Sequence, residues 1–80
     1  MAILRLFASA REAAGVSHDD MPGHTVGEVL AGASARYGAP FAAVLGNCRI
    51  WVNGESANAD TVISARDEVA VLPPVSGGAV

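Results

Sequence analysis

The chain has 80 residues, 51% of them hydrophobic and 16% charged, so we expect one globular domain with a modest core and not a disordered chain. Its net charge of −3 and its five scattered arginines, with no lysine, argue against nucleic acid as the main partner. A single cysteine and no apolar run near the ~20 residues of a membrane span predict a cytoplasmic protein that does not enter membranes.

Two strands and a short helix are predicted at the start of the chain. Residues 3–8 alternate as a strand, with the even-numbered side chains on one face and the odd-numbered ones on the other. Residues 16–22 are short and polar and predict an edge strand beside the first. Between them, Ser9 is expected to cap one or two helical turns, with Glu12 at the capping-box position and Gly15 at the end.

The main helix is predicted over residues 26–37. Thr25 and Glu28 are spaced as a capping box at its start, and apolar side chains then recur at helical spacing. Residues 38–40 are expected to end this helix, and residues 41–45 to add one further turn.

Three strands are predicted in the second half of the chain. Residues 48–53 alternate, and Asn53-Gly54 then predicts a hairpin turn with a brief return over residues 55–57. The last strand covers residues 68–72. This order of elements predicts an α+β fold of the β-grasp (ubiquitin-like) type, a mixed sheet of four to five strands with one main helix packed across it.

The outward positions of the first, third and last strands are expected to share one exposed face. An exposed aromatic and aliphatic face with arginines is typical of a protein interface, unless a helix or loop covers it. The expected face, with Val75 as its continuation, consists of Arg5, Phe7, Arg49, Trp51, Ala70, Leu72 and Val75.

Other candidate groups point to structure more than to chemistry. Cys48 alternates inward, and a buried cysteine usually acts as a small hydrophobic residue. His18 and His24 match no metal-binding pattern, and no set of residues for independent catalysis is present. We therefore expect no metal and no bound cofactor.

The chain finishes with LPPVSGGAV, which divides it into a domain over residues 1–75 and a flexible tail over residues 76–80. Pro73 and Pro74 favour an extended segment, and Gly77 and Gly78, after Ser76, carry no side chain that would obstruct a narrow passage. A frayed terminus is the alternative reading.

Four stretches carry a family resemblance: LRLFASAREAAG, TVGEVLAGASARYG, WVNGE and DEVAVLPPVSGG. The first three are ordinary patterns, whereas a final strand running into Pro-Pro-Val-Ser-Gly-Gly is specific. The chain resembles the MoaD/ThiS family of ubiquitin-like sulfur carriers, above all its molybdopterin synthase small-subunit branch. Thiamine-pathway carriers share the Gly-Gly but usually lack the Pro-Pro.

The resemblance implies a carrier and not a free-standing enzyme. The Gly78 carboxylate would be adenylated by an E1-like adenylating sulfurtransferase that uses ATP, and then converted to a thiocarboxylate. The tail, with Ser76 and Gly77, would enter the molybdopterin synthase large subunit and pass sulfur to a pyranopterin precursor of the molybdenum cofactor.

Gly78 is followed by Ala79 and Val80, so its carbonyl is held in a peptide bond. We expect a processing protease to remove the pair. The alternatives are that the pair is an accident of how the sequence was defined, or that the protein has lost carrier chemistry. Other functions also stay open, namely a carrier for thiamine or cysteine synthesis, or a non-carrier β-grasp module that binds or modifies proteins.

Overall fold

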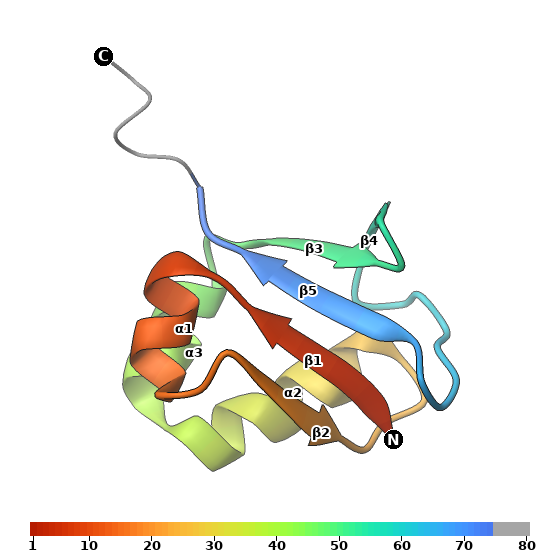
Figure 1. The fold of residues 1–80 in the computed structure, drawn as a ribbon, viewed down its shortest axis with the longest axis horizontal. Helices are drawn as coiled ribbons and strands as arrows, with labels where there is room; N and C mark the ends of the chain where they lie inside the picture. Colours follow the sequence, from red (N-terminus) through yellow and green to blue (C-terminus); the bar gives the residue numbers. More distant parts are fainter. Residues whose placement is uncertain (75–80) are drawn as a thin grey trace.

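The computed structural model describes residues 1–74, which form a five-stranded sheet in the order β2-β1-β5-β3-β4 (Figure 1). The elements are β1 (Ala2–Leu6), α1 (Ala8–Ala14), β2 (His18–Met21), α2 (Val26–Tyr37), α3 (Ala39–Leu45), β3 (Arg49–Val52), β4 (Glu55–Ala57) and β5 (Glu68–Leu72). β1 and β5 are parallel, and the other three strand pairs are antiparallel. The predicted β-grasp fold is confirmed.

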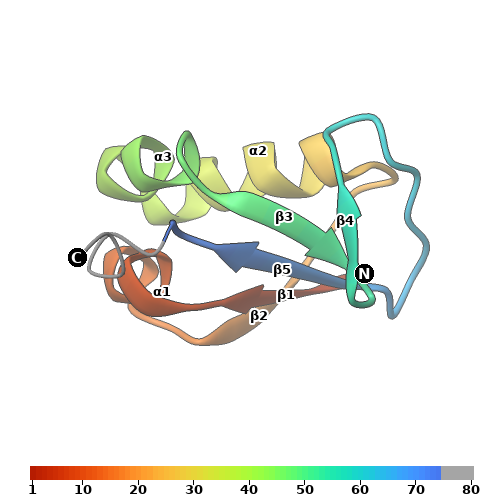
Figure 2. The ribbon, with the colours of Figure 1, turned by 90° about the horizontal axis from the view of Figure 1, so that it is seen from above.

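The helices leave one face of the sheet open. Figure 2 shows α2 and α3 together on one side of the sheet, while α1 lies at the end where β1 and β5 finish. The buried face of the sheet and the inner faces of the helices form one core. Its fully buried members with the largest side chains are Phe41, Leu4, Leu6, Met21, Val26, Val29, Val69 and Val71.

The predicted boundaries of α2 are confirmed to the residue. The Thr25 hydroxyl accepts a hydrogen bond from the Glu28 backbone N–H at 3.2 Å, which satisfies one of the free donors of the first turn. The Glu28 carboxylate accepts one from the His24 N–H at 2.7 Å, one residue earlier than in the usual capping box. Tyr37 ends the helix, and Gly38 follows with a φ of 95°.

The predicted cap of α1 was wrong. The helix begins at Ala8, so Ser9 and Glu12 lie inside it, and Phe7 is the N-cap with no side-chain hydrogen bond. Ala8 has a φ of 51°, a conformation that is uncommon for a residue with a Cβ. This turn also ends β1 at Leu6, two residues before the predicted end, whereas Gly15 ends the helix as predicted.

Other element boundaries also differ from the predictions. Residues 39 and 40 begin α3 instead of ending α2, because proline is tolerated in the first turn of a helix. The edge strand β2 covers only four residues of the predicted 16–22. β3 covers Arg49–Val52, so Cys48 precedes the strand and Asn53 follows it.

A polar cluster joins the edge strand β2 to the end of α2. The Tyr37 hydroxyl donates to Asp19 Oδ2 at 2.6 Å, and Arg36 Nη1 donates to the same oxygen at 3.0 Å. Burial first, and then the hydrogen bond to Asp19, raise the pKa of Tyr37 to about 12. The hydrogen bonds from Tyr37 and Arg36 hold the pKa of Asp19 below its ordinary value.

This cluster predicts that the stability lost on removing the Tyr37 hydroxyl group depends on pH. Folding raises the pKa of Tyr37 from its ordinary value of 10.0 to about 12. The stabilisation that Tyr37 gives the folded protein is therefore fully present below pH 10 and is lost as the pH rises towards 12. We expect Tyr37→Phe to lower the free energy of unfolding by about 1 kcal/mol at pH 8, the usual net worth of a hydrogen bond. Urea unfolding of both proteins from pH 8 to 12 measures the difference, which should shrink above pH 10. A difference independent of pH would contradict this account.

Candidate functional site

The tail root is the point where the last strand leaves the sheet. β5 is a central strand, flanked by β1 and β3, and its last paired residue is Leu72, opposite Arg49. Pro73 is half-buried and Pro74 is exposed; neither has an N–H with which to continue the ladder. The predicted site residues Val75, Ser76, Gly77 and Gly78 lie outside the described residues, and their roles stay predictions.

A small hollow of about 230 Å³ lies beside the tail root. Among the described residues, its lining comes from α1, the end of α3 and the two prolines: Ser9, Val44, Asn47, Pro73 and Pro74. The tail root therefore borders this hollow through its two prolines.

The strand register brings the predicted interface residues onto the open sheet face. Arg5 lies opposite Ala70, and Ala70 lies opposite Trp51, so these side chains form one row across β1, β5 and β3. Leu72 and Arg49 form the next row, nearer the tail root. We call this set, with Phe7, the open sheet face.

Exposure differs along the open sheet face. Arg5 and Arg49 are exposed, Trp51 and Leu72 are half-buried, and Phe7, just beyond β1, is 42% exposed. An Arg5–Glu68 ion pair of 3.8 Å lies on the same face, but both side chains are about half exposed, so it adds little stability. This mixture of apolar and cationic groups suits protein contact.

Cys48 lies where it contributes to packing. It is half-buried against the core, and its Sγ donates to the Val44 carbonyl at 3.2 Å. Burial raises the pKa of its thiol, which favours the protonated form over the nucleophilic thiolate. This environment agrees with the structural role predicted for Cys48.

Two further findings concern metal binding and membrane-spanning helices in residues 1–74. Within that range, no three His, Cys, Asp or Glu side chains are placed to hold a metal ion. No helix in the same part of the chain has both the length and the apolar character needed to cross a bilayer.

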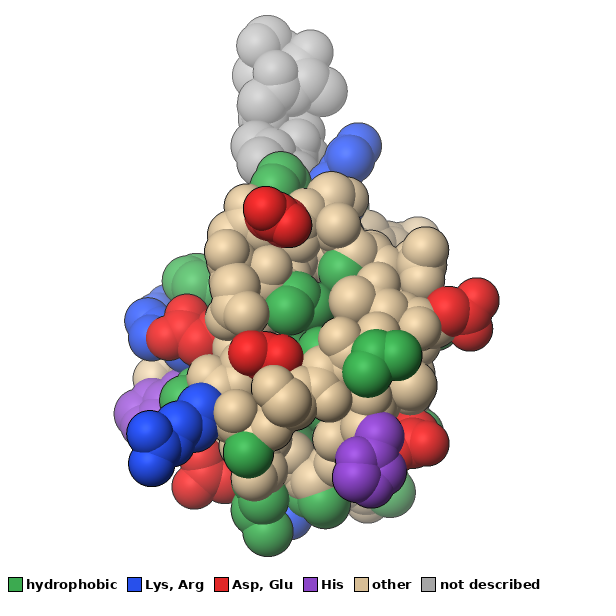
Figure 3. Space-filling model, turned by 90° about the vertical axis from the view of Figure 1, so that its right-hand side faces the viewer, with side chains coloured by type: hydrophobic (Ala, Val, Ile, Leu, Met, Phe, Trp, Pro, Cys, Tyr) green, Lys and Arg blue, Asp and Glu red, His purple; other side chains and the backbone are tan. Residues whose placement is uncertain are grey.

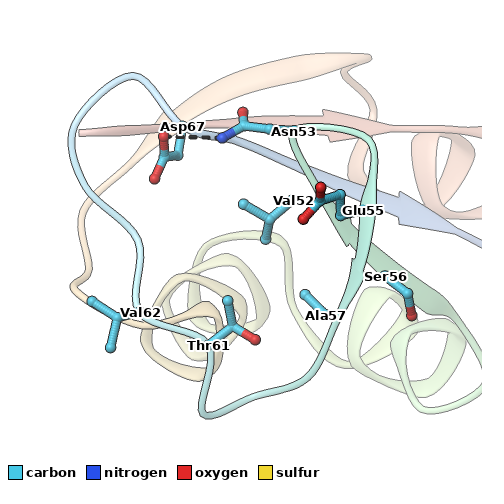
Figure 4. A pocket seen from close by; sticks show the side chains of 8 residues that line it. All are labelled: Val52, Asn53, Glu55, Ser56, Ala57, Thr61, Val62 and Asp67. Carbon is cyan, nitrogen blue, oxygen red and sulfur yellow. Dashed lines mark hydrogen bonds between the residues drawn. The ribbon is translucent and has the colours of Figure 1, made fainter.

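A larger hollow, which we call the hairpin hollow, was missed by the sequence analysis. It has a volume of about 410 Å³ and lies between the β3–β4 hairpin and the loop over residues 58–67 (Figure 4). Its lining consists of Val52, Asn53, Glu55, Ser56, Ala57, Thr61, Val62 and Asp67. In the sequence, only the Asn53-Gly54 turn pointed to this region. The loop opposite the turn is positioned by contacts between residues distant in sequence, such as Asn53 and Asp67.

Comparison with known proteins agrees with the fold. The ThiS family model matches residues 4–78, a range that includes both glycines of the tail. SAMP1 from Haloferax volcanii is 33% identical, with 96% of this chain and 98% of that chain covered and a TM-score of 0.80. A putative molybdopterin converting factor, subunit 1, from Pyrococcus furiosus is 26% identical, with 92% and 97% covered and a TM-score of 0.79.

A third solved structure supports the fold but is too distant in sequence to support more. The chain matches a structure of the BexX/CysO complex from Amycolatopsis orientalis at 19% identity, with 98% and 100% covered and a TM-score of 0.80. No curated protein matches the chain.

The five-stranded sheet, the helix across it and the match to the ThiS family model define a ubiquitin-like protein of the sulfur-carrier class. The chain belongs to the ThiS family, whose model covers nearly all of it. The Pyrococcus furiosus protein is named as one subunit of a converting factor.

Proposed function

We propose that the chain is the sulfur-carrying small subunit of a molybdopterin synthase. The observation that carries the proposal is the ThiS family match, which extends to Gly78. The Pro73-Pro74 segment at the end of β5 and the similarity to the converting-factor subunit support the molybdopterin branch.

In this proposal the reacting group is the carbonyl carbon of Gly78. Hydrolysis of the Gly78–Ala79 bond by a protease first frees the carboxylate. A carboxylate is a poor acyl donor, so an adenylating enzyme joins it to AMP from ATP and releases pyrophosphate. Sulfide then displaces AMP, and the resulting thiocarboxylate gives its sulfur to a pyranopterin precursor in the large subunit. The chain itself holds no cofactor, and the cytoplasm is its proposed location.

The open sheet face would bind these partner proteins. We expect Phe7→Glu to weaken binding to the adenylating enzyme by about tenfold or more, because a charge would be buried in an apolar contact. Leu72→Glu should act in the same direction. Isothermal titration calorimetry with the purified enzyme measures the affinity.

Ala35→Glu is the matched control for Phe7→Glu. Ala35 is exposed and lies on α2, which packs on the side of the sheet opposite the open sheet face. This variant should bind the enzyme like the unchanged chain. Equal affinities for the Phe7 and Ala35 variants would remove the open sheet face from the proposal.

The pathway is tested by adding the thiocarboxylated chain to purified large subunit and pyranopterin precursor. Formation of the dithiolene product, detected by mass spectrometry, supports the molybdopterin assignment. Failure to form product, together with sulfur delivery to a thiamine or cysteine precursor, would assign the chain to another sulfur pathway.

The similarity to SAMP1 favours a second candidate, because that name denotes a small archaeal modifier protein and the identity is 33%. As a modifier, the chain would become covalently attached to other proteins. Denaturing gels of cell extract, probed with antibody to the chain, would then show bands of higher mass. These bands should vanish when Gly77 and Gly78 are deleted, and their absence in the unchanged strain would exclude this candidate.

A further inference from the structure

The hairpin hollow lies at the end of the molecule opposite the tail root. Asp67 precedes the first residue of β5, whereas Pro73 follows its last residue, so β5 separates the two sites. Figure 3 looks onto this end and shows hydrophobic side chains inside a hollow with acidic side chains at its edge. A molecule in the hairpin hollow would leave the tail root accessible.

One side of the hollow is formed by the β3–β4 hairpin turn and the start of β5, which side-chain hydrogen bonds hold together. Asn53 Nδ2 donates to Asp67 Oδ1 at 3.1 Å, and the Glu68 N–H donates to Asn53 Oδ1 at 2.9 Å. The Ser64 N–H donates to Asp67 Oδ2 at 2.8 Å. These bonds tie the hairpin turn to the start of β5, so the carboxylate of Asp67 is fixed in place before any partner arrives.

The other side of the hollow is the loop over residues 58–67, which is hydrogen-bonded to the start of α2. The Val26 N–H donates to the Thr61 carbonyl at 3.0 Å, and the Ile63 N–H donates to the His24 carbonyl at 2.9 Å. Val62 lies between these two anchored residues, yet its side chain is 78% exposed. The hydrogen-bonded backbone on both sides of Val62 thus fixes this part of the loop at the edge of the hollow.

The lining combines negative charge with aliphatic surface. Glu55 and Asp67 supply two carboxylates, and none of the lining residues is basic. Hydrogen bonds from Ser64 and Asn53 hold the pKa of Asp67 below its ordinary value, so this group stays ionised at neutral pH. In Figure 4, Val52, Glu55 and Ala57 point into the space between hairpin and loop.

A cation with a long aliphatic stem fits this combination. The stem of an arginine can lie on Val52 and Ala57, as such stems commonly do on apolar surface. Its guanidinium group carries five N–H donors, and Glu55 and Asp67 offer acceptors at the edge of the same hollow.

We propose that the hairpin hollow is a second docking site, occupied by an arginine side chain that a partner protein presents. The site would hold the partner protein at the end of β5 opposite the tail root. The proposal does not rest on the proposed function, because neither the tail nor the open sheet face contributes to the hollow.

The test uses the full chain labelled with nitrogen-15 and a capped pentapeptide, Ala-Val-Arg-Val-Ala. Titration should give saturable NMR shifts at the amides that line the hollow. The same peptide with neutral citrulline in place of arginine should bind more weakly, and added salt should weaken the arginine peptide. Glu55→Gln should weaken it about two- to fivefold, the range for one exposed ion pair.

Glu12→Gln is the matched control, since Glu12 is an exposed carboxylate on α1. It should bind the arginine peptide as the unchanged chain does, and the amide spectrum of each variant verifies its fold. The proposal is overturned by equal binding of the two peptides, by unchanged affinity in Glu55→Gln, by shifts located elsewhere, or by no saturable shift.

Discussion

A chain that ends at Gly78 is expected to take up sulfur at least about a hundredfold faster than one that ends at Gly77, since misplacing a reacting group by 1 Å can cost that much. Removal of one residue withdraws the carboxylate by about 3.5 Å. Both chains keep the whole described domain, so the difference would arise in the acyl transfer and not in folding. Thiocarboxylate formation with adenylating enzyme, ATP and sulfide is followed by intact mass.

Two further chains make this comparison specific. Protein that retains Ala79 after Gly78 should accept no sulfur in the purified system, because its Gly78 carbonyl is part of a peptide bond. A Gly78 chain with Phe7→Glu should load more slowly at low enzyme concentration but react normally once bound. Equal loading of the Gly77 and Gly78 chains would show that the length of the tail is unimportant.

Phe41→Ala should destabilise the domain by about 3–5 kcal/mol, the cost of emptying a fully buried aromatic site. Phe41 is completely buried, and its ring meets that of Tyr37 edge to face, with centroids 5.2 Å apart. The seven-residue α3 is too short to be stable by itself, so its helix depends on this burial. For an 80-residue domain this loss is a large share of the total stability.

Urea unfolding measures the effect, with Phe7→Ala as the matched control. Phe7 is 42% exposed, so its loss should cost less than about 1 kcal/mol. A cost below 1 kcal/mol for Phe41→Ala, or equal costs at both positions, would show that α3 is not anchored by its aromatic residue.

The sheet and the main helix could be predicted because their signals are local. β5 was predicted to the residue from alternation followed by two prolines, and α2 from the Thr25 and Glu28 spacing and Gly38. Placement of Arg5, Trp51 and Leu72 on one face also followed, since alternation within each strand determines the face once the strand order is known.

The elements that were missed depend on contacts distant in sequence. Ala8 adopts a positive φ that its own propensity disfavours, and this moves the start of α1 away from Ser9. The Asn53–Asp67 bond spans 14 positions and requires β3 and β5 to be paired already. The hairpin hollow therefore could not be predicted from any single segment.

The central claim is that Gly78 becomes the working end of a sulfur carrier. It is tested most directly by the intact mass of the protein recovered from its own cells, before and after incubation with adenylating enzyme, ATP and a sulfide donor. The account predicts cleavage after Gly78, followed by exchange of one oxygen for one sulfur. A mass that still includes Ala79 and never changes would contradict it, and would leave the open sheet face as a binding surface without acyl chemistry.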